Sequence, residues 1–428
     1  MLTLSFSAIV VMALLGAPIF AVFSLLALTA FYFAEIDVTA VSIEMLRLST
    51  HPTLLAIPLF TFAGYLMAES KTPTRLLNLA QAAFGWLPGG VAIVSLLVCA
   101  LFTAFTGGSG VTIIALGGLL YPILTRQGYS EKFSLGLITA SGSLGLLFPP
   151  SLPIILYGLI AKVDIDKLFI AGIVPCFILI AILSAYAIFT GRVKKSDLTQ
   201  AISMRQAFSW DTFFKALWNA RYELPIPVFV LVGIYAGLTT ASEASAVVAA
   251  YVIAMTCFLY KDLNFFKDVP RITRESMTLV GAILLILVCA LGFVNYIIDE
   301  EVPLQILDFM KTHIDSQLTF LLTLNIFLLI VGMMLDIFTA IVVVVPIITP
   351  IAAEFGVDPI HLAIIFLTNL EIGYLTPPVG LNLFIASFRF KKPVVSVYKA
   401  SIPFLLLLII GLIIVTYIPS ISLFWFDQ

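Results

Sequence analysis

Glycines and hydroxyl residues are bunched together in the middle of a long apolar stretch. Residues 106–112 read Thr-Gly-Gly-Ser-Gly-Val-Thr, and the surrounding residues 90–125 carry no charge. A straight helix of that length would exceed the thickness of a bilayer. The glycines allow the chain to turn, and the hydroxyls of Ser109 and Thr112 offer the oxygen ligands that hard cations prefer. The stretch therefore predicts a re-entrant hairpin or two short crossings, and a small-residue face for helix packing is a third interpretation.

Two proline pairs interrupt stretches that would otherwise be helical. Pro149-Pro150 follows a segment rich in glycine and serine, and Pro377-Pro378 follows Gly373-Tyr-Leu-Thr. Proline lacks a backbone donor and disfavours helix in the residue before it, so each pair frees backbone polar groups inside a span. Irregular backbone at membrane depth is tolerated only inside protein or beside a water-filled cavity. The breaks therefore predict a binding site, with a simple proline kink as the alternative.

Three acidic residues lie within apolar stretches. A carboxylate inside a span is a candidate functional group. Asp336 either ligates sodium together with Thr339 or caps the helix that follows it. Glu243 lies three residues after a threonine at the start of an apolar run, which favours a capping box. Glu371 lies just before the second break, and the sequence assigns it no role.

Residue counts argue against an enzyme. Gly107-Gly-Ser-Gly110 matches the GxSG of rhomboid-type intramembrane proteases, but none of the three histidines lies inside a span to act as the base. Asp336 is the one embedded aspartate, whereas an aspartyl intramembrane protease needs a pair. The chain contains no Gly-Lys pair, which excludes a P-loop. The four cysteines lie in apolar segments without CxxC spacing and are expected to be buried thiols.

Membrane helices must position these groups. Of the 428 residues, 61% are hydrophobic and 11% are charged, against roughly 25% charged in an average soluble domain. The net charge of −2 implies no basic face for nucleic acid. The composition predicts an all-α polytopic membrane protein with roughly ten or more apolar spans. Residues 2–34 lack a basic n-region and are expected to form the first transmembrane helix.

The distribution of basic residues predicts an orientation. Of the 22 Lys and Arg residues, 18 fall in loops expected inside, at 69–89, 125–132, 191–223, 261–275 and 389–399. The outer loops hold the remaining 4. The positive-inside rule then places the N-terminus in the cytoplasm and the C-terminus outside.

The chain also aligns with itself. At an offset of 228, residues 145–150 align with 373–378, and at an offset of 230, residues 69–73 align with 299–303 and 106–110 with 336–340. Each half would carry a hairpin followed by a helix broken at Pro-Pro, in opposite orientations. Such inverted repeats are typical of secondary transporters, because alternating access needs two similar structures of opposite orientation. We expect a first inverted repeat at 1–190 (hairpin 90–125, broken helix 133–161), a cytoplasmic connector at 191–223, and a second inverted repeat at 224–428 (hairpin 316–353, broken helix 359–388).

Seven motifs follow one another over nearly the whole chain: Gly16-Ala-Pro18, Pro58-Leu-Phe-Thr-Phe-Ala-Gly64, Gly107-Gly-Ser-Gly-Val-Thr112, Gly145–Pro150, Thr240–Ala244, Gly332–Asp336 and Gly373–Asn382. In content and order they resemble the large membrane subunit of TRAP transporters (tripartite ATP-independent periplasmic transporters, DctM type). Ala241-Ser242 departs from the Pro-Thr that often precedes the glutamate in that family.

The resemblance implies an elevator-type transporter in the bacterial inner membrane that imports organic acid anions, such as C4-dicarboxylates or sialic acid, with sodium as the coupling ion. It implies no covalently bound cofactor. It further implies a small four-helix membrane subunit (DctQ type) and a periplasmic solute-binding protein (DctP type) as partners, beside membrane lipid. It places the ion sites at the hairpin tips and the broken helices.

No Lys, Arg or His is embedded, so we expect helix N-termini, side-chain oxygens and bound sodium to hold an anionic substrate. The residues expected to bind substrate are Ser109, Thr112, Ser143, Pro149, Pro150, Thr376, Pro377, Pro378 and Asn382. Sodium is expected near Thr106, Gly107, Gly108, Ser109, Gly145, Asp336, Thr339, Gly373 and Thr376. A stand-alone ion-coupled transporter of the same design is the alternative function, and a polytopic membrane enzyme is a weaker one.

Overall fold

The structure is a computed structural model that describes residues 2–37, 39, 41–43, 46, 52–87, 89–190, 208–314 and 316–426. The described residues form helices joined by turns and contain no β-strand, which confirms the all-α prediction. Much of the expected connector, residues 191–207, lies outside the described residues.

Long apolar helices make up much of the described chain. By length and composition, 7 described helices are able to cross a membrane, and one pair of shorter helices, bent by 44°, makes an eighth span. The prediction of roughly ten or more spans is therefore too high by this criterion, because glycine and proline breaks leave other apolar helices with only 10–17 residues. The long helices are α7 (Ser109–Arg126), α10 (Ile165–Thr190), α14 (Ala241–Ile253) with the π-helical turn Ala254–Leu259, α15 (Asp268–Asp299), α17 (Gln317–Met334), α18 (Ile337–Glu354) and α21 (Val394–Tyr417).

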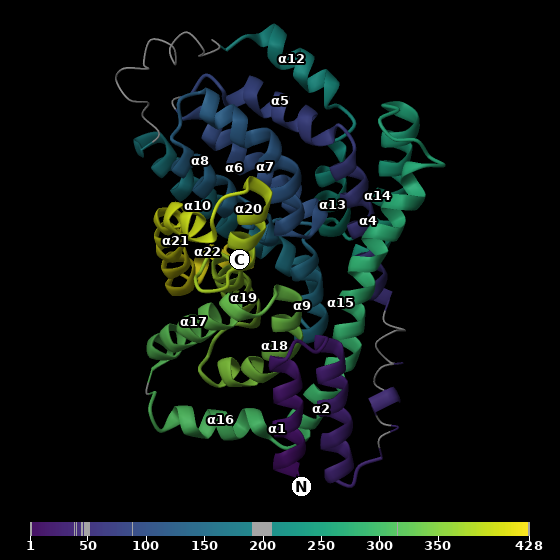
Figure 1. The fold of residues 1–428 in the computed structure, drawn as a ribbon, viewed down its shortest axis with the longest axis vertical. Helices are drawn as coiled ribbons and strands as arrows, with labels where there is room; N and C mark the ends of the chain where they lie inside the picture. The colour runs from purple at the N-terminus through teal and green to yellow at the C-terminus, as the bar shows by residue number, and fades with distance from the viewer. Residues whose placement is uncertain are drawn as a thin grey trace.

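The N-terminal apolar stretch is a helical hairpin, so the prediction of a single transmembrane helix over residues 2–34 is wrong. α1 (Leu2–Leu14) ends before Gly16, and α2 (Ile19–Phe33) begins after Pro18. Gly16 has a φ of +89°, a conformation that favours glycine, and Pro18 cannot donate a helical hydrogen bond. The two helices pack side by side (Figure 1). The chain therefore returns to the end from which it started, which removes the basis for a cytoplasmic N-terminus.

Two further helical hairpins occupy the predicted positions. α6 (Gly90–Thr106) and α7 are joined by Gly107-Gly108, and α17 and α18 are joined by Leu335-Asp336. Gly107 has a φ of +67°, and a Cβ there would lie 2.2 Å from the Leu152 side chain. The tight turn therefore requires glycine, and residues 90–125 are not one helix with a small-residue face.

Two interrupted helices contain the proline pairs. The first runs through α8 (Glu131–Ser141), the 3₁₀ turn η2 (Leu144–Leu147) and α9 (Leu152–Ala161), and the second through α19 (Pro359–Gly373) and α20 (Leu381–Phe390). Both Pro-Pro peptide bonds are cis. The two breaks differ in environment, because Pro149-Pro150 is buried whereas Pro378 is exposed.

The remaining helices enclose these elements. α4 (Ala56–Glu69), which follows the short η1 (Pro52–Leu55), packs with α14 and α15 on one side of the molecule, and α10 packs with α21 on the other (Figure 1). α13 (Pro225–Tyr235) packs on α14, and α22 (Ser420–Leu423) packs on α10 and α19.

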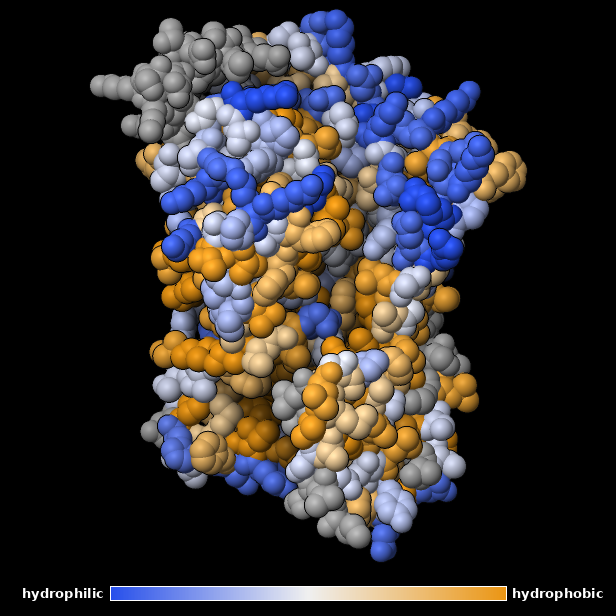
Figure 2. Space-filling view, viewed as in Figure 1, coloured by the Kyte–Doolittle hydropathy of each residue, from blue (hydrophilic) through white to orange (hydrophobic). Residues whose placement is uncertain are grey.

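Short helices lie across both ends of the molecule. α5 (Thr72–Phe84) and α12 (Trp210–Asn219) lie at the upper end in Figure 1, and α16 (Val302–Lys311) lies at the lower end beside the N-terminal hairpin. Hydrophilic residues gather at the upper end, and apolar residues cover much of the middle (Figure 2). This distribution is the one expected of a chain whose middle faces lipid.

Candidate functional site

The first hairpin packs against the first break without room for side chains between them. A Cβ on Gly145 would lie 2.0 Å from the carbonyl oxygen of Ala100 in α6. A Cβ on Gly142 would lie 2.6 Å from the side chain of Ile113 in α7. The glycines of the break therefore allow η2 to touch both limbs of the hairpin.

Hydroxyl groups hold this contact together. Thr103 Oγ1 lies 2.7 Å from Thr112 Oγ1 and donates to the carbonyl of Gly142 at 2.8 Å. Thr112 thus joins α7 to α6 within the hairpin, and Thr103 joins the hairpin to the break. Ser109 is buried as the first residue of α7. Thr103 was not among the predicted site residues, although its position one helical turn before Thr106 was a usable signal.

The second hairpin turns at Asp336, whose carboxylate caps α18. It accepts hydrogen bonds from the backbone N–H groups of Phe338 and Thr339 at 3.0 Å each, and the Thr339 hydroxyl donates to its other oxygen. Of the two roles considered for Asp336, the cap is therefore the one that the structure shows. The backbone N–H of Ile337 donates to the Tyr374 hydroxyl at 2.7 Å, which ties the hairpin tip to the second break.

Gly332 and Gly373 form the closest approach between α17 and α19. A Cβ on Gly373 would lie 2.5 Å from the backbone of Gly332. Beyond this crossing, the backbone N–H of Gly380 donates to the Met333 carbonyl at 3.3 Å. The second break and the second hairpin tip are therefore neighbours, as the first break and first tip are.

The two breaks also contact each other across the halves of the chain. Ser143 Oγ donates to the backbone carbonyl of Glu371 at 3.4 Å, and Asn382 Nδ2 donates to the backbone carbonyl of Thr139 at 3.4 Å. Asn382 is fully buried, and its Oδ1 has no hydrogen-bond partner among the described residues. Thr376 is partly exposed and donates to Ile372 O at 3.1 Å.

Arg389 brings a positive charge to the first hairpin, which the sequence did not lead us to expect. Its Nε donates to the carbonyl of Ile114 in α7 at 2.8 Å, and its guanidinium lies over Gly118. The spacing contained the signal: Arg389 follows Asn382 by two helical turns and so lies on the same face of α20. Because Arg389 begins the expected inside loop 389–399, the sequence suggested a charge at the membrane surface and not one beside the site.

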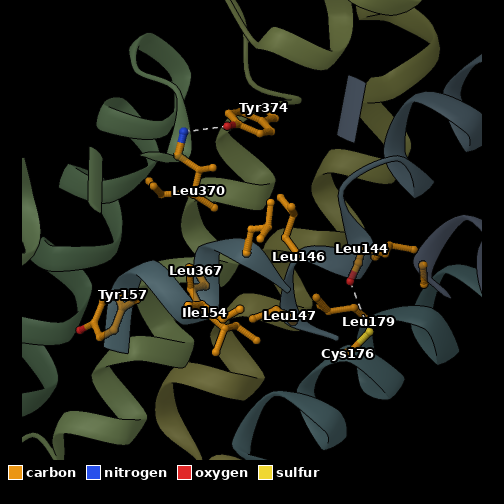
Figure 3. Packing of buried hydrophobic residues seen from close by; sticks show 14 of the residues in the cluster. Leu144, Leu146, Leu147, Ile154, Tyr157, Cys176, Leu179, Leu367, Leu370 and Tyr374 are labelled. Carbon is orange, nitrogen blue, oxygen red and sulfur yellow. Dashed lines mark hydrogen bonds between the residues drawn. The ribbon is translucent and has the colours of Figure 1, made fainter. Parts of the chain in front are cut away.

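The other two embedded acids have different surroundings. Glu243 forms the predicted capping box at the start of α14, where it accepts from the backbone N–H of Thr240 at 2.8 Å. Glu371 is fully buried, and neither carboxylate oxygen has a hydrogen-bond partner among the described residues. Apolar side chains of η2, α9, α10 and α19 meet in this part of the molecule, including Leu144, Leu147 and Leu370 (Figure 3).

The site is built mainly from neutral oxygen atoms. Within the described ranges, no group of three or more His, Cys, Asp or Glu side chains is placed to hold a metal ion. Hydroxyl, amide and main-chain carbonyl oxygens lie at both hairpin tips and both breaks, and these are ligands that a hard cation such as sodium accepts. The donor set fits sodium and does not fit a transition metal.

The proline pairs flank this region. Leu152, two residues after Pro150, packs on Gly107 at the first hairpin tip. Pro378 faces outward, and its carbonyl accepts a hydrogen bond from the Tyr398 hydroxyl. The prolines therefore shape the breaks, whereas the hydroxyls and amides nearby supply polar side-chain groups.

Comparison with known proteins agrees with this architecture. The chain is 38% identical over 397 residues to the C4-dicarboxylate TRAP transporter large permease protein DctM of Pseudomonas aeruginosa, covering 93% of this chain and 91% of that one. It is 36% identical over 372 residues to the isethionate TRAP transporter permease protein DctMQ of Oleidesulfovibrio alaskensis, covering 87% of this chain and 58% of that one. The solved structure of the Alcanivorax borkumensis YdaH transporter matches with a TM-score of 0.61 at 14% identity, covering 90% of this chain and 88% of that one, which supports the fold alone.

Residues 6–421 match the family described as the DctM component of tripartite ATP-independent periplasmic transporters. The match includes both hairpins and both breaks. The chain therefore belongs to the DctM family and is the large permease subunit of a TRAP transporter.

Proposed function

We propose that this subunit moves an organic acid anion across the bacterial inner membrane and that a sodium gradient drives the uptake. The observation that carries the proposal is the meeting of both breaks, through Ser143 with Glu371 and Asn382 with Thr139. A substrate bound where two similar halves meet contacts both of them, and the two halves then provide the alternative openings of a transporter.

Two of the relatives and one feature of the site support an anionic substrate, although other relatives are named for ectoine. The relatives above are named for a C4-dicarboxylate and for isethionate, both of which are small organic anions. α7 begins at Ser109 without a side-chain cap, so its N-terminus at the first hairpin tip favours negative charge, whereas the Asp336 carboxylate already occupies the N-terminus of α18. Arg389 and bound sodium would add positive charge.

We propose that sodium binds at both hairpin tips. The first site would use oxygen atoms of residues 106–109 and Gly145, and the second those near Thr339, Gly373 and Thr376. Asp336 would act there through its cap, by holding the first turn of α18 in place.

The partners we propose are a small four-helix membrane subunit of the DctQ type and a periplasmic solute-binding protein of the DctP type. The family description as a tripartite system supports this assembly. The charge distribution supports a cytoplasmic position for the end that carries α5 and α12. The N-terminal hairpin and α16 would then face the periplasm (Figure 1).

The test is uptake into proteoliposomes that contain this subunit and the small subunit, with the binding protein and radiolabelled C4-dicarboxylate outside. We expect uptake only with an inward sodium gradient and only with the binding protein present. Ser109→Ala and Thr376→Val should each raise the sodium concentration for half-maximal uptake several-fold, because each removes an oxygen near a proposed ion site, while both variants still assemble.

Thr323→Val is the matched control, because Thr323 lies on the exposed face of α17 and bonds only within its own helix. Unchanged sodium activation in both site variants would refute the proposed ion sites. Uptake that proceeds at full rate without the binding protein would instead identify a stand-alone transporter.

A further inference from the structure

Three large aromatic side chains of α12 are exposed on the part of the chain that the structure describes. Trp210, Phe214 and Trp218 follow one another at intervals of four residues and therefore share one side of the helix. Their exposed fractions are 64%, 57% and 68%. Ala216, on the opposite side, is buried where α12 packs on α5. The helix thus uses its small residue for packing and turns its largest side chains away from the protein.

The face continues onto the end of α5. The ring of Phe208 lies 4.9 Å from that of Trp210 and 6.3 Å from that of Trp86, which is itself 47% exposed. We call Trp86, Phe208, Trp210, Phe214 and Trp218 the aromatic face. It contains three of the four tryptophans of the chain, and tryptophan is enriched where membrane meets water.

The C-terminal end of α12 is fastened to the membrane helices. The Tyr260 hydroxyl donates to the Asn219 carbonyl and lies 2.8 Å from Glu223 Oε2. Arg75 of α5 pairs with Glu223 and, at 2.7 Å, with Asp262. Burial lowers the pKa of Arg75, but the hydrogen bonds and charges of both carboxylates outweigh it and raise the pKa overall. α12 is therefore held with its aromatic face outward.

Basic residues border the aromatic face. The Arg221 guanidinium stacks 4.5 Å above the ring of Trp218, and the exposed Lys215 of α12 pairs with the exposed Asp211 one turn before it at 2.7 Å. Aromatic and apolar side chains next to Lys and Arg are the pattern of a helix that lies in the membrane surface.

We propose that α12 is an interfacial helix whose aromatic face enters the cytoplasmic leaflet and whose bordering cations bind anionic phospholipid headgroups. The proposal rests on the proposed orientation of the chain but not on its substrate or coupling ion. α12 packs on α5, and α5 leads directly into the membrane hairpin α6–α7, so α12 lies at the end of the molecule where this hairpin begins (Figure 1). Lipid fits better than cytosol, because soluble surfaces rarely expose a contiguous apolar patch of this kind.

The first test measures tryptophan fluorescence of the full chain, in complex with the small subunit, in phosphatidylcholine vesicles. A variant with Trp86→Phe, Trp218→Phe and Trp425→Phe, in complex with a small subunit from which tryptophan has been removed, keeps Trp210 as the single reporter. We expect brominated phosphatidylcholine to quench Trp210 severalfold more strongly than aqueous iodide does. Quenching by iodide without quenching by brominated lipid would overturn the proposal, since the face would then point into water. Protection of Trp210 from both quenchers would also overturn it, because a protein subunit would then cover the face.

The second test concerns the headgroups. Adding phosphatidylglycerol to phosphatidylcholine vesicles should raise the melting temperature of the unmodified complex. We expect this shift to be smaller in Lys215→Gln/Arg221→Gln and unchanged in Lys267→Gln, a basic residue away from the aromatic face. An undiminished shift in the double variant would overturn the role of these cations.

Discussion

Asp336 shows how the surroundings of one residue give it a structural role beside the one expected of it. An embedded carboxylate suggests ion binding, yet this one accepts the N–H groups of Phe338 and Thr339 and the Thr339 hydroxyl. A capping carboxylate satisfies donors that the first turn of a helix leaves free. For Arg389 the structure adds a contact that the sequence did not suggest. This residue was expected in a loop, and its guanidinium lies against the first hairpin.

Arg389 yields a prediction at the residue scale. Arg389→Gln should raise the substrate concentration for half-maximal uptake about tenfold. The change removes the contact between the guanidinium and the anionic substrate, and a charged contact of this kind is worth roughly 1–2 kcal/mol. Arg389→Lys should recover part of the loss, since it keeps the charge but not the fork of donors. The measurement is initial uptake rate against substrate concentration, with the exposed Lys391→Gln as the control. If the two variants Arg389→Gln and Lys391→Gln show the same substrate concentration for half-maximal uptake, Arg389 does not contact the substrate and only fixes α20 to α7.

Among the elements, glycine pairs decide which helices cross closely. The repeat of glycine before each Pro-Pro pair was legible in the sequence, and it predicted where the helices are interrupted. What each glycine touches was not legible, because contacts such as Gly373 with Gly332 join residues that are distant in the chain. The sequence also predicted one helix at the N-terminus, because the length of the apolar stretch was long enough for a single span. Gly16 and Pro18 instead divide this stretch into two helices.

The crossing of α17 and α19 gives a prediction at the element scale. Gly373→Ala should destabilise the subunit by about 1–3 kcal/mol, as expected when extra volume is forced into a packed contact. Gly281→Ala is the matched control, because a Cβ at Gly281 in α15 meets nothing within 4 Å. Thermal unfolding of the purified complex would compare them. A Gly373→Ala variant as stable as Gly281→Ala would contradict the close packing of the two helices.

The whole molecule divides into a group of helices around α4, α14 and α15 and a group formed by the hairpins and broken helices. We propose an elevator motion that slides the second group along the first. α4 touches the tip of the first hairpin through Gly64, where a Cβ would lie 2.1 Å from the carbonyl of Phe105. This contact lies on the surface along which such a motion has to occur.

Gly64→Ala therefore tests motion at the scale of the whole molecule. We expect a severalfold lower maximal uptake rate, because the added methyl group obstructs the passage of the hairpin tip past α4. A Cβ at Gly64 would also lie 2.7 Å from Thr106 Cα at the first proposed ion site, so the melting temperature with and without sodium is the control: a retained sodium-dependent rise assigns the lower rate to obstructed movement and not to a damaged ion site. An unchanged maximal rate would show that this contact does not limit the movement.

The sequence by itself determined the membrane class, the family resemblance, the two breaks and the residues from which a site is assembled. These properties depend on composition and on local backbone chemistry, which a linear pattern of glycine, proline and charge records directly. Only the tertiary structure showed that the Asp336 carboxylate caps α18, that Arg389 contacts the first hairpin and that residues 2–34 fold back on themselves. Those outcomes depend on which distant backbones approach within a few ångströms, and one-dimensional periodicity does not contain that information.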